Sequence, residues 1–153
     1  MTETAPPTTQ GGAKAFLAAG LLSLVGAGSA EAQEATMRIQ FSLNGKVVTA
    51  RLEDGPATRD FLAMLPMTVS LEDYASTEKI AYLPGKLSTH GAPDGIEPKK
   101  GDVTYYAPWG NLAIFQKDFR YSSGLVKLGR VESGFEELIR PGAAQITIER
   151  EGQ

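Results

Sequence analysis

The sequence of 153 residues contains no cysteine and a single histidine, His90. Without cysteine the chain can form no disulfide bond, thiolate nucleophile or cysteine-ligated zinc site. Charge of one sign is not in excess either, because 15 Lys and Arg stand against 18 Asp and Glu, and the densest basic cluster is Lys99-Lys100. Nucleic-acid binding needs a basic face. We therefore expect no nucleic-acid partner.

The motifs of common catalytic and cofactor sites are also missing. His90 lies in the loop sequence STHGAPDG with no partner at ligand spacing, which argues against a transition-metal site. The Ser-Ser-Gly run at 122–124 lacks the frame of a nucleophile elbow and is typical of a turn. Asp94 and Glu97 are close in sequence, and solvated charge, acid–base chemistry and calcium binding are all open for them. We expect no metal, no cofactor and no recognisable catalytic residue.

The first 32 residues have the layout of a secretory signal. Lys14 precedes an uncharged, mostly apolar run over 15–28, which is short for a membrane-spanning helix. Ala30-Glu31-Ala32 then provides a small-x-small cleavage pattern. This layout predicts a signal peptide over 1–32, a folded domain over 33–153, and a periplasmic or secreted protein that is not stably inserted in a membrane. The alternative is a cytoplasmic protein whose translation starts at Met37.

The folded part opens with a hairpin pattern. Apolar and polar residues alternate over 37–43, which is typical of a half-buried strand. Asn44-Gly45 follows, a strong signal for a type I′ turn, and 46–52 reads as the returning strand. The sequence therefore predicts a β-hairpin over 37–52.

One short helix should follow this hairpin. Pro56 suits a first helical turn, and Asp54 is placed to cap its free N–H groups. Phe61, Leu62 and Leu65 fall on one helical face, and the run ends at Pro66.

The rest of the chain reads mostly as strands, which favours a mainly β fold: a closed antiparallel barrel with one or two short helices. A helical turn is expected over 134–139. Residues 84–101, rich in Gly and Pro, read as a long loop of the kind that often carries function. The strands are expected over 66–74, 78–83, 102–107, 111–116, 125–131 and 144–150.

Two stretches, in order along the chain, resemble the cyclophilins. The first carries Pro56, Thr58, Phe61 and Leu65, and the second comprises Asn111 to Phe115 followed by VKLGRVESGFEEL at 126–138. The chain is most similar to the bacterial cyclophilin-like proteins, which carry a motif close to YYAPWGNLAIF. The resemblance covers most of 37–150 and implies a fold more than a function, since that family has no agreed activity.

The chemistry of prolyl isomerisation carries over poorly. In cyclophilins it depends on an arginine that stabilises the twisted amide, on a phenylalanine-lined pocket, and on a glutamine and a histidine. By resemblance, Phe115 stands at the pocket position, whereas the glutamine and histidine positions fall at Ala113 and Leu125. The nearest match to the arginine strand, residues 82–87, contains no arginine. A non-catalytic binding module is therefore our leading interpretation, and a divergent prolyl isomerase using Arg59 or Arg120 is the alternative. A third hypothesis is a structural or partner-binding role of the barrel surface, without a pocket.

Aromatic residues gather on and around the strand predicted over 111–116. Leu112 and Ile114 would lie on one face of this strand and Ala113 and Phe115 on the other. Both faces are apolar, so both should be covered. Trp109 and Phe119 could plug a barrel end, or they could line a groove for a peptide or a small apolar molecule. For the second interpretation, the candidate ligand-binding residues are Tyr106, Trp109, Phe115, Phe119 and Tyr121.

Overall fold

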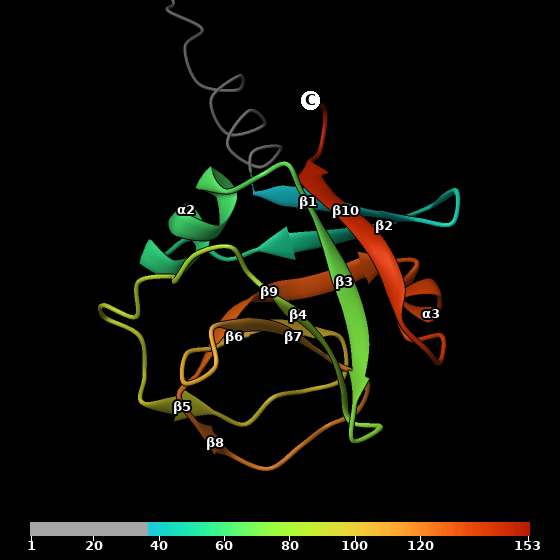
Figure 1. Cartoon of the computed structure of the whole chain (residues 1–153). Helices are drawn as coiled ribbons and strands as arrows, with labels where there is room; N and C mark the ends of the chain where they lie inside the picture. The colour runs from blue at the N-terminus through green and yellow to red at the C-terminus, as the bar shows by residue number, and fades with distance from the viewer. Residues whose placement is uncertain (1–36) are drawn as a thin grey trace, which may run out of the picture.

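The computed structural model describes residues 37–153, so the segment predicted as a signal peptide lies outside the described residues. Eight strands form a closed barrel in the order β1-β10-β3-β4-β7-β6-β9-β2, and every neighbouring pair is antiparallel (Figure 1). The predicted fold class is confirmed. The barrel strands are β1 (Arg38–Leu43), β2 (Lys46–Leu52), β3 (Met67–Tyr74), β4 (Glu78–Tyr82), β6 (Asp102–Tyr106), β7 (Asn111–Phe115), β9 (Leu125–Ser133) and β10 (Ala144–Arg150).

The first hairpin forms as predicted. Asn44 and Gly45 both have positive φ, 49° and 73°, as a type I′ turn requires. The register between β1 and β2 places Phe41 opposite Val48, and both side chains are fully buried. The alternation read from the sequence is therefore the alternation between the barrel interior and its surface.

The helix α2 (Pro56–Ala63) begins at the expected proline, but Asp54 does not cap it. The residue at the N-cap is Gly55, which offers no side-chain acceptor. The Asp54 carboxylate instead accepts a hydrogen bond from Arg59 at 2.9 Å. The helix is held by its apolar face, because Phe61 and Leu62 are buried in the barrel core.

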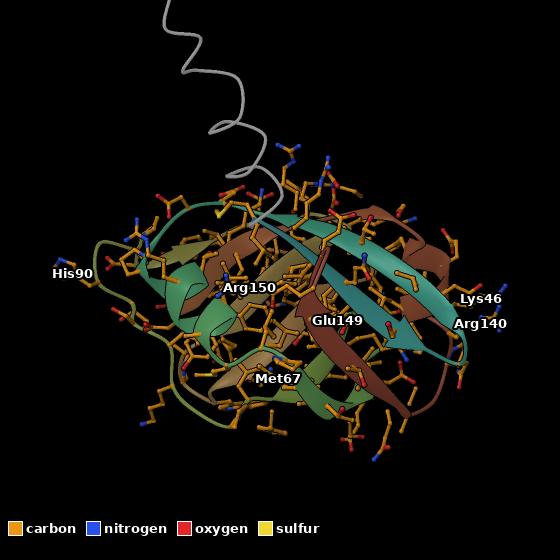
Figure 2. The ribbon with its side chains drawn as sticks, turned by 90° about the horizontal axis from the view of Figure 1, so that it is seen from above. Lys46, Met67, His90, Arg140, Glu149 and Arg150 are labelled. Carbon is orange, nitrogen blue, oxygen red and sulfur yellow. The ribbon has the colours of Figure 1, made fainter. Side chains whose placement is uncertain are left out.

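Helices α2 and α3 (Phe135–Leu138) lie at opposite ends of the barrel (Figures 1 and 2). Leu138 of α3 and Phe61 of α2 both belong to the main core cluster. At the α2 end, Arg150 at the end of β10 donates to the Leu62 carbonyl at 3.0 Å. The interior of the barrel is thus filled by side chains and closed at both ends.

The sequence predicted one long loop over 84–101, but this segment is not wholly irregular. It contains β5 (Gly95–Ile96), which pairs with β8 (Ser122–Ser123) in a separate two-stranded sheet. The run at 122–124 was predicted to be a turn, and this prediction was wrong for its two serines. The reason is tertiary, since β5 supplies a pairing partner that lies about 27 residues away in sequence.

A buried lysine ties β4 to the segment before β10. The Lys79 side chain is 1% exposed, and its Nζ donates to the Asp73 carboxylate at 2.6 Å and to the Gly142 carbonyl at 3.0 Å. It also donates to the carbonyl of Arg140. The Gly142 N–H in turn donates to Asp73 at 2.7 Å. The buried charge is therefore fully paired, as burial of an ammonium group demands.

Candidate functional site

Strand β7 is covered on both faces, as predicted. Leu112 and Ile114 point into the barrel and belong to the main core. Ala113 and Phe115 point outward, where they form a second apolar cluster with Ile80 of β4 and other neighbours. The outer side of the β4–β7–β6 wall is therefore a surface on which loops have packed.

A hollow of about 460 Å³ opens on this outer side. Its wall includes all five aromatic residues proposed from the sequence, so the fold brings these residues together. Several further side chains complete the wall. The hollow, which we call the aromatic groove, is lined by Tyr74, Glu78, Tyr106, Trp109, Phe115, Phe119, Arg120, Tyr121, Ser122, Ser123 and Leu125.

Trp109 lies against the outside of the barrel wall and does not plug a barrel end. It follows Tyr106 in the tight turn to β7, where Gly110 adopts a φ of 71° and donates its N–H to the Tyr106 carbonyl at 2.9 Å. The indole meets Tyr74 and Tyr106 edge to face, with 5.4 Å between ring centroids in each pair. Even so, 48% of Trp109 stays exposed. A large aromatic surface is thus held in place and left open to solvent.

Phe119 forms the opposite wall and also lies outside the barrel core. Its ring stacks on Phe115 at 6.3 Å, and the Arg120 guanidinium lies 4.8 Å from the Phe119 ring centroid. The Phe119 N–H donates to the Pro98 carbonyl at 3.0 Å, which fixes this loop to the 84–101 loop. These contacts therefore hold the Phe119 side of the groove against Phe115 of the rigid strand β7.

The serine strand β8 is held at the groove by a close backbone approach. A Cβ added at Gly95 would lie 2.3 Å from the Ser122 carbonyl oxygen, so only glycine fits there. The Gly124 N–H, next along the chain, donates to the Asp94 carbonyl at 2.7 Å. In the sequence, nothing in the Asp94-Gly95 pair of the long loop points to 122–124 as its partner.

Glu78 is a groove residue that the sequence analysis missed. It opens β4, where alternation alone gave no reason to single out one glutamate among many. Its side chain is half-buried, and this burial raises the pKa of its carboxyl group. The register places it directly opposite Tyr74 on one side and opposite Phe115 on the other.

The positions taken over from cyclophilins lie on this same face but carry no catalytic groups. Ala113 and Leu125 belong to the outer cluster with Phe115. Arg59 is not in the groove, since it pairs with Asp54, whereas Arg120 is. The groove therefore offers one guanidinium beside the phenylalanine pocket, and it offers neither the glutamine nor the histidine.

The other candidates from the sequence lie apart from the groove. His90 is exposed and projects from the edge of the molecule (Figure 2). Glu97 pairs with Lys99 at 2.8 Å. Within residues 37–153, no group of three His, Cys, Asp or Glu side chains is arranged to hold a metal ion. In the same part of the chain, no helix is long and apolar enough to span a membrane.

A second hollow of similar size lies over β3 and β4. Its volume is about 470 Å³, but a single aromatic ring, Tyr82, lines it, together with polar residues such as Ser70 and Glu72. It lacks the convergence of rings and charges that marks the aromatic groove. The aromatic groove is therefore the stronger candidate site.

Comparisons with known proteins agree with this architecture. A family model described as the cyclophilin-like family matches residues 41–149. A hypothetical protein from Archaeoglobus fulgidus, solved in solution, has a similar fold with a TM-score of 0.55 and 16% identity, over 76% of this chain and 96% of the archaeal one. A search of curated proteins found no match.

Proposed function

The chain belongs to the cyclophilin-like family, and we propose that its barrel is a non-enzymatic binding module whose ligand, a peptide or a small apolar molecule, lies in the aromatic groove. The observation that carries this proposal is the convergence of Tyr106, Trp109, Phe115, Phe119 and Tyr121 on one hollow. Loops on a rigid scaffold are where binding residues concentrate. Exposed aromatic rings that are held in place lose little entropy when a ligand covers them.

Trp109 offers both the binding surface and the readout, since it is the only tryptophan of the chain. We expect its fluorescence to shift when benzyl alcohol or the peptide acetyl-Ala-Ala-Pro-Phe-amide is added to the full chain. Trp109→Ala should weaken binding of these probes about 30-fold by calorimetry, because buried aromatic anchors contribute about 2 kcal/mol or more.

The matched control is Tyr82→Ala, which removes an exposed ring that is not part of the groove. It should leave probe affinity unchanged. A Trp109→Ala protein that is folded and keeps full affinity would overturn the groove as the binding site.

Export to the periplasm or beyond belongs to the same proposal, on the basis of the signal layout over 1–32. The test is the N-terminal sequence of the protein recovered from the periplasm of expressing cells. A mature N-terminus at Gln33 would support export, and retention in the cytoplasm with an intact N-terminus would oppose it.

One observation favours a second candidate, a divergent prolyl isomerase. Arg120 lines the groove together with Phe115, which is the pairing that amide twisting would need. A protease-coupled assay with Ala-Ala-Pro-Phe p-nitroanilide decides between the two. Acceleration that is lost in both Phe115→Ala and Arg120→Gln would make the protein an enzyme, whereas a folded protein without acceleration is the result expected for a binding module.

A further inference from the structure

The aromatic groove contains one carboxylate set among rings. Tyr74, Glu78 and Phe115 stand in a row across β3, β4 and β7, because each is directly opposite the next in the strand register. Side chains opposite each other on antiparallel strands have Cβ atoms about 4.5–5.5 Å apart. The Glu78 carboxylate is therefore flanked by a phenol ring on one side and a phenyl ring on the other.

This carboxylate has no partner within the described part of the chain. No hydrogen bond or ion pair to the Glu78 side chain is formed there, although burial raises the pKa of the group. The adjacent Lys79 is engaged with Asp73, and the Arg120 guanidinium lies over Phe119. A partly desolvated charge without a partner costs stability, and a cation in the groove would remove part of that cost.

The surrounding rings favour a positive charge. Trp109 stands roughly perpendicular to Tyr74 and Tyr106, with interplanar angles of 83° and 76°, and Tyr74 and Trp109 are 42% and 48% exposed. The faces of aromatic rings carry negative potential and attract ammonium groups, most strongly for tryptophan. Carboxylate and rings thus select for the same kind of ligand.

We propose that the aromatic groove recognises an organic ammonium ion, which pairs with Glu78 and packs against Tyr74 and Trp109. This inference rests on the proposed binding function and specifies the chemical class of the ligand. The ammonium group has two sources, a small free amine or the lysine side chain of a peptide. The positive charge of the groove, Arg120, lies over the Phe119 ring, so the part of the groove around Glu78 is its negative end.

The first experiment compares three probes of the same shape on the full chain by Trp109 fluorescence: benzylammonium, benzyl alcohol and benzoate. Benzylammonium should bind at least tenfold more tightly than benzyl alcohol, since a hydrogen bond to a charged group is worth about 1.5–3 kcal/mol. Benzoate should bind most weakly. Glu78→Gln should reduce benzylammonium affinity to the level of benzyl alcohol and leave benzyl alcohol unchanged.

Two further variants test whether benzylammonium affinity depends on a direct ion pair with Glu78 or on the overall charge around the groove. Glu72→Gln removes an exposed carboxylate from the neighbouring strand, outside the groove, and should not change the affinity for benzylammonium. Arg120→Gln removes the positive charge of the groove and should raise that affinity. Glu78→Gln keeps the shape of the side chain, so circular dichroism should show the same fold.

The pH dependence supplies a second readout. Benzylammonium affinity should fall as pH is lowered through the raised pKa of Glu78, whereas benzyl alcohol affinity should stay constant. The other ionisable groups that line the groove are Tyr74, Tyr106, Tyr121 and Arg120, so Glu78 is its only carboxyl group.

Equal binding of benzylammonium and benzyl alcohol, or a preference for benzoate, would overturn the ammonium inference and leave the binding function intact. Binding of none of the probes would overturn both. The two sources are then distinguished with acetyl-Gly-Lys-Gly-amide, its norleucine counterpart and butylammonium. A higher affinity for the lysine peptide than for butylammonium would assign the ammonium group to a peptide side chain, and the reverse order would assign it to a small amine. Equal affinities for the norleucine and lysine peptides would contradict both assignments.

Discussion

At the scale of a single residue, the partial burial of Glu78 makes stability depend on pH. Burial raises the pKa of its carboxyl group, so the folded state binds its proton more tightly than the unfolded state does. The free energy of unfolding contributed by this residue is therefore highest at acid pH and falls as pH rises through the raised pKa. Ionised Glu78 is tolerated in the fold at a cost, which is consistent with a role in binding.

Replacing Glu78 by Gln should raise the melting temperature at pH 7 by a few degrees, because the partly desolvated charge is removed. The gain over wild type should shrink as pH is lowered and vanish below the usual range of glutamate pKa values. Thermal denaturation followed by circular dichroism across pH 3–8 measures it. A variant less stable than wild type at pH 7 would mean that the carboxylate has a stabilising partner.

The pair of Lys79 and Asp73 predicts an asymmetry. Lys79 is buried whereas the Asp73 side chain is 38% exposed, so Asp73→Asn leaves an unbalanced buried ammonium and should cost about 3 kcal/mol. Lys79→Met should cost less, since Asp73 can be hydrated. Urea unfolding of both variants tests this order, and a larger loss in Lys79→Met would contradict it.

The same pair has a defined pH dependence. Hydrogen bonding from Lys79 and from the Gly142 N–H lowers the pKa of Asp73. Its contribution to stability is therefore complete above the usual carboxyl pKa and is lost as pH falls through the lowered one. This pH dependence is opposite in sign to that of Glu78. As pH is lowered, the stability lost in Asp73→Asn should shrink, and so should the stability gained in Glu78→Gln.

At the scale of elements, the small β5–β8 sheet and the barrel wall can be perturbed separately. A Cβ added at Gly95 would lie 2.3 Å from the Ser122 carbonyl oxygen, and a Cβ added at Gly129 would lie 2.0 Å from the Arg51 carbonyl oxygen. Both distances are too short for any residue other than glycine. Gly129→Ala pushes apart β2 and β9 and should lower global stability by about 1–3 kcal/mol. Gly95→Ala should instead release the 84–101 loop with a smaller change in melting temperature.

The readouts for these glycine variants are thermal denaturation, limited proteolysis and probe affinity. Gly95→Ala should be cut faster within 84–101 and should bind benzyl alcohol more weakly, because Ser122 and Ser123 line the groove. Gly55→Ala is the control, as nothing lies within 4 Å of its added Cβ. Unchanged cleavage in Gly95→Ala would show that the β5–β8 pairing does not hold the loop.

At the scale of the whole molecule, closure of the barrel depends on its last strand. β10 pairs with β1 on one side and with β3 on the other, and its Ile146 and Ile148 are fully buried. Deleting 144–153 opens the barrel and removes these core side chains, so the truncated chain should not fold. Deleting only 151–153 should leave a cooperative thermal transition, and a folded chain without β10 would contradict the role of closure.

The local structure of the chain could be read from its amino-acid pattern alone. Alternation, the Asn44-Gly45 turn and Pro56 identified the barrel strands and α2 because these signals act between residues close in the chain. The aromatic groove residues could also be identified, since Phe115 lies on one doubly apolar strand and Tyr106, Trp109, Phe119 and Tyr121 lie on either side of it in sequence. The mainly β barrel follows from the number and spacing of these strands.

Which residues lie opposite one another on neighbouring strands depends on the fold and could not be read from the sequence. The pairing of β5 with β8, the burial of Lys79 and the place of Glu78 between Tyr74 and Phe115 all depend on register between distant segments. A glutamate on a strand looks the same in sequence whether it faces solvent or a ring of aromatic side chains. Its desolvation and its lack of a partner arise from packing, and these properties make it the centre of the proposed ammonium site.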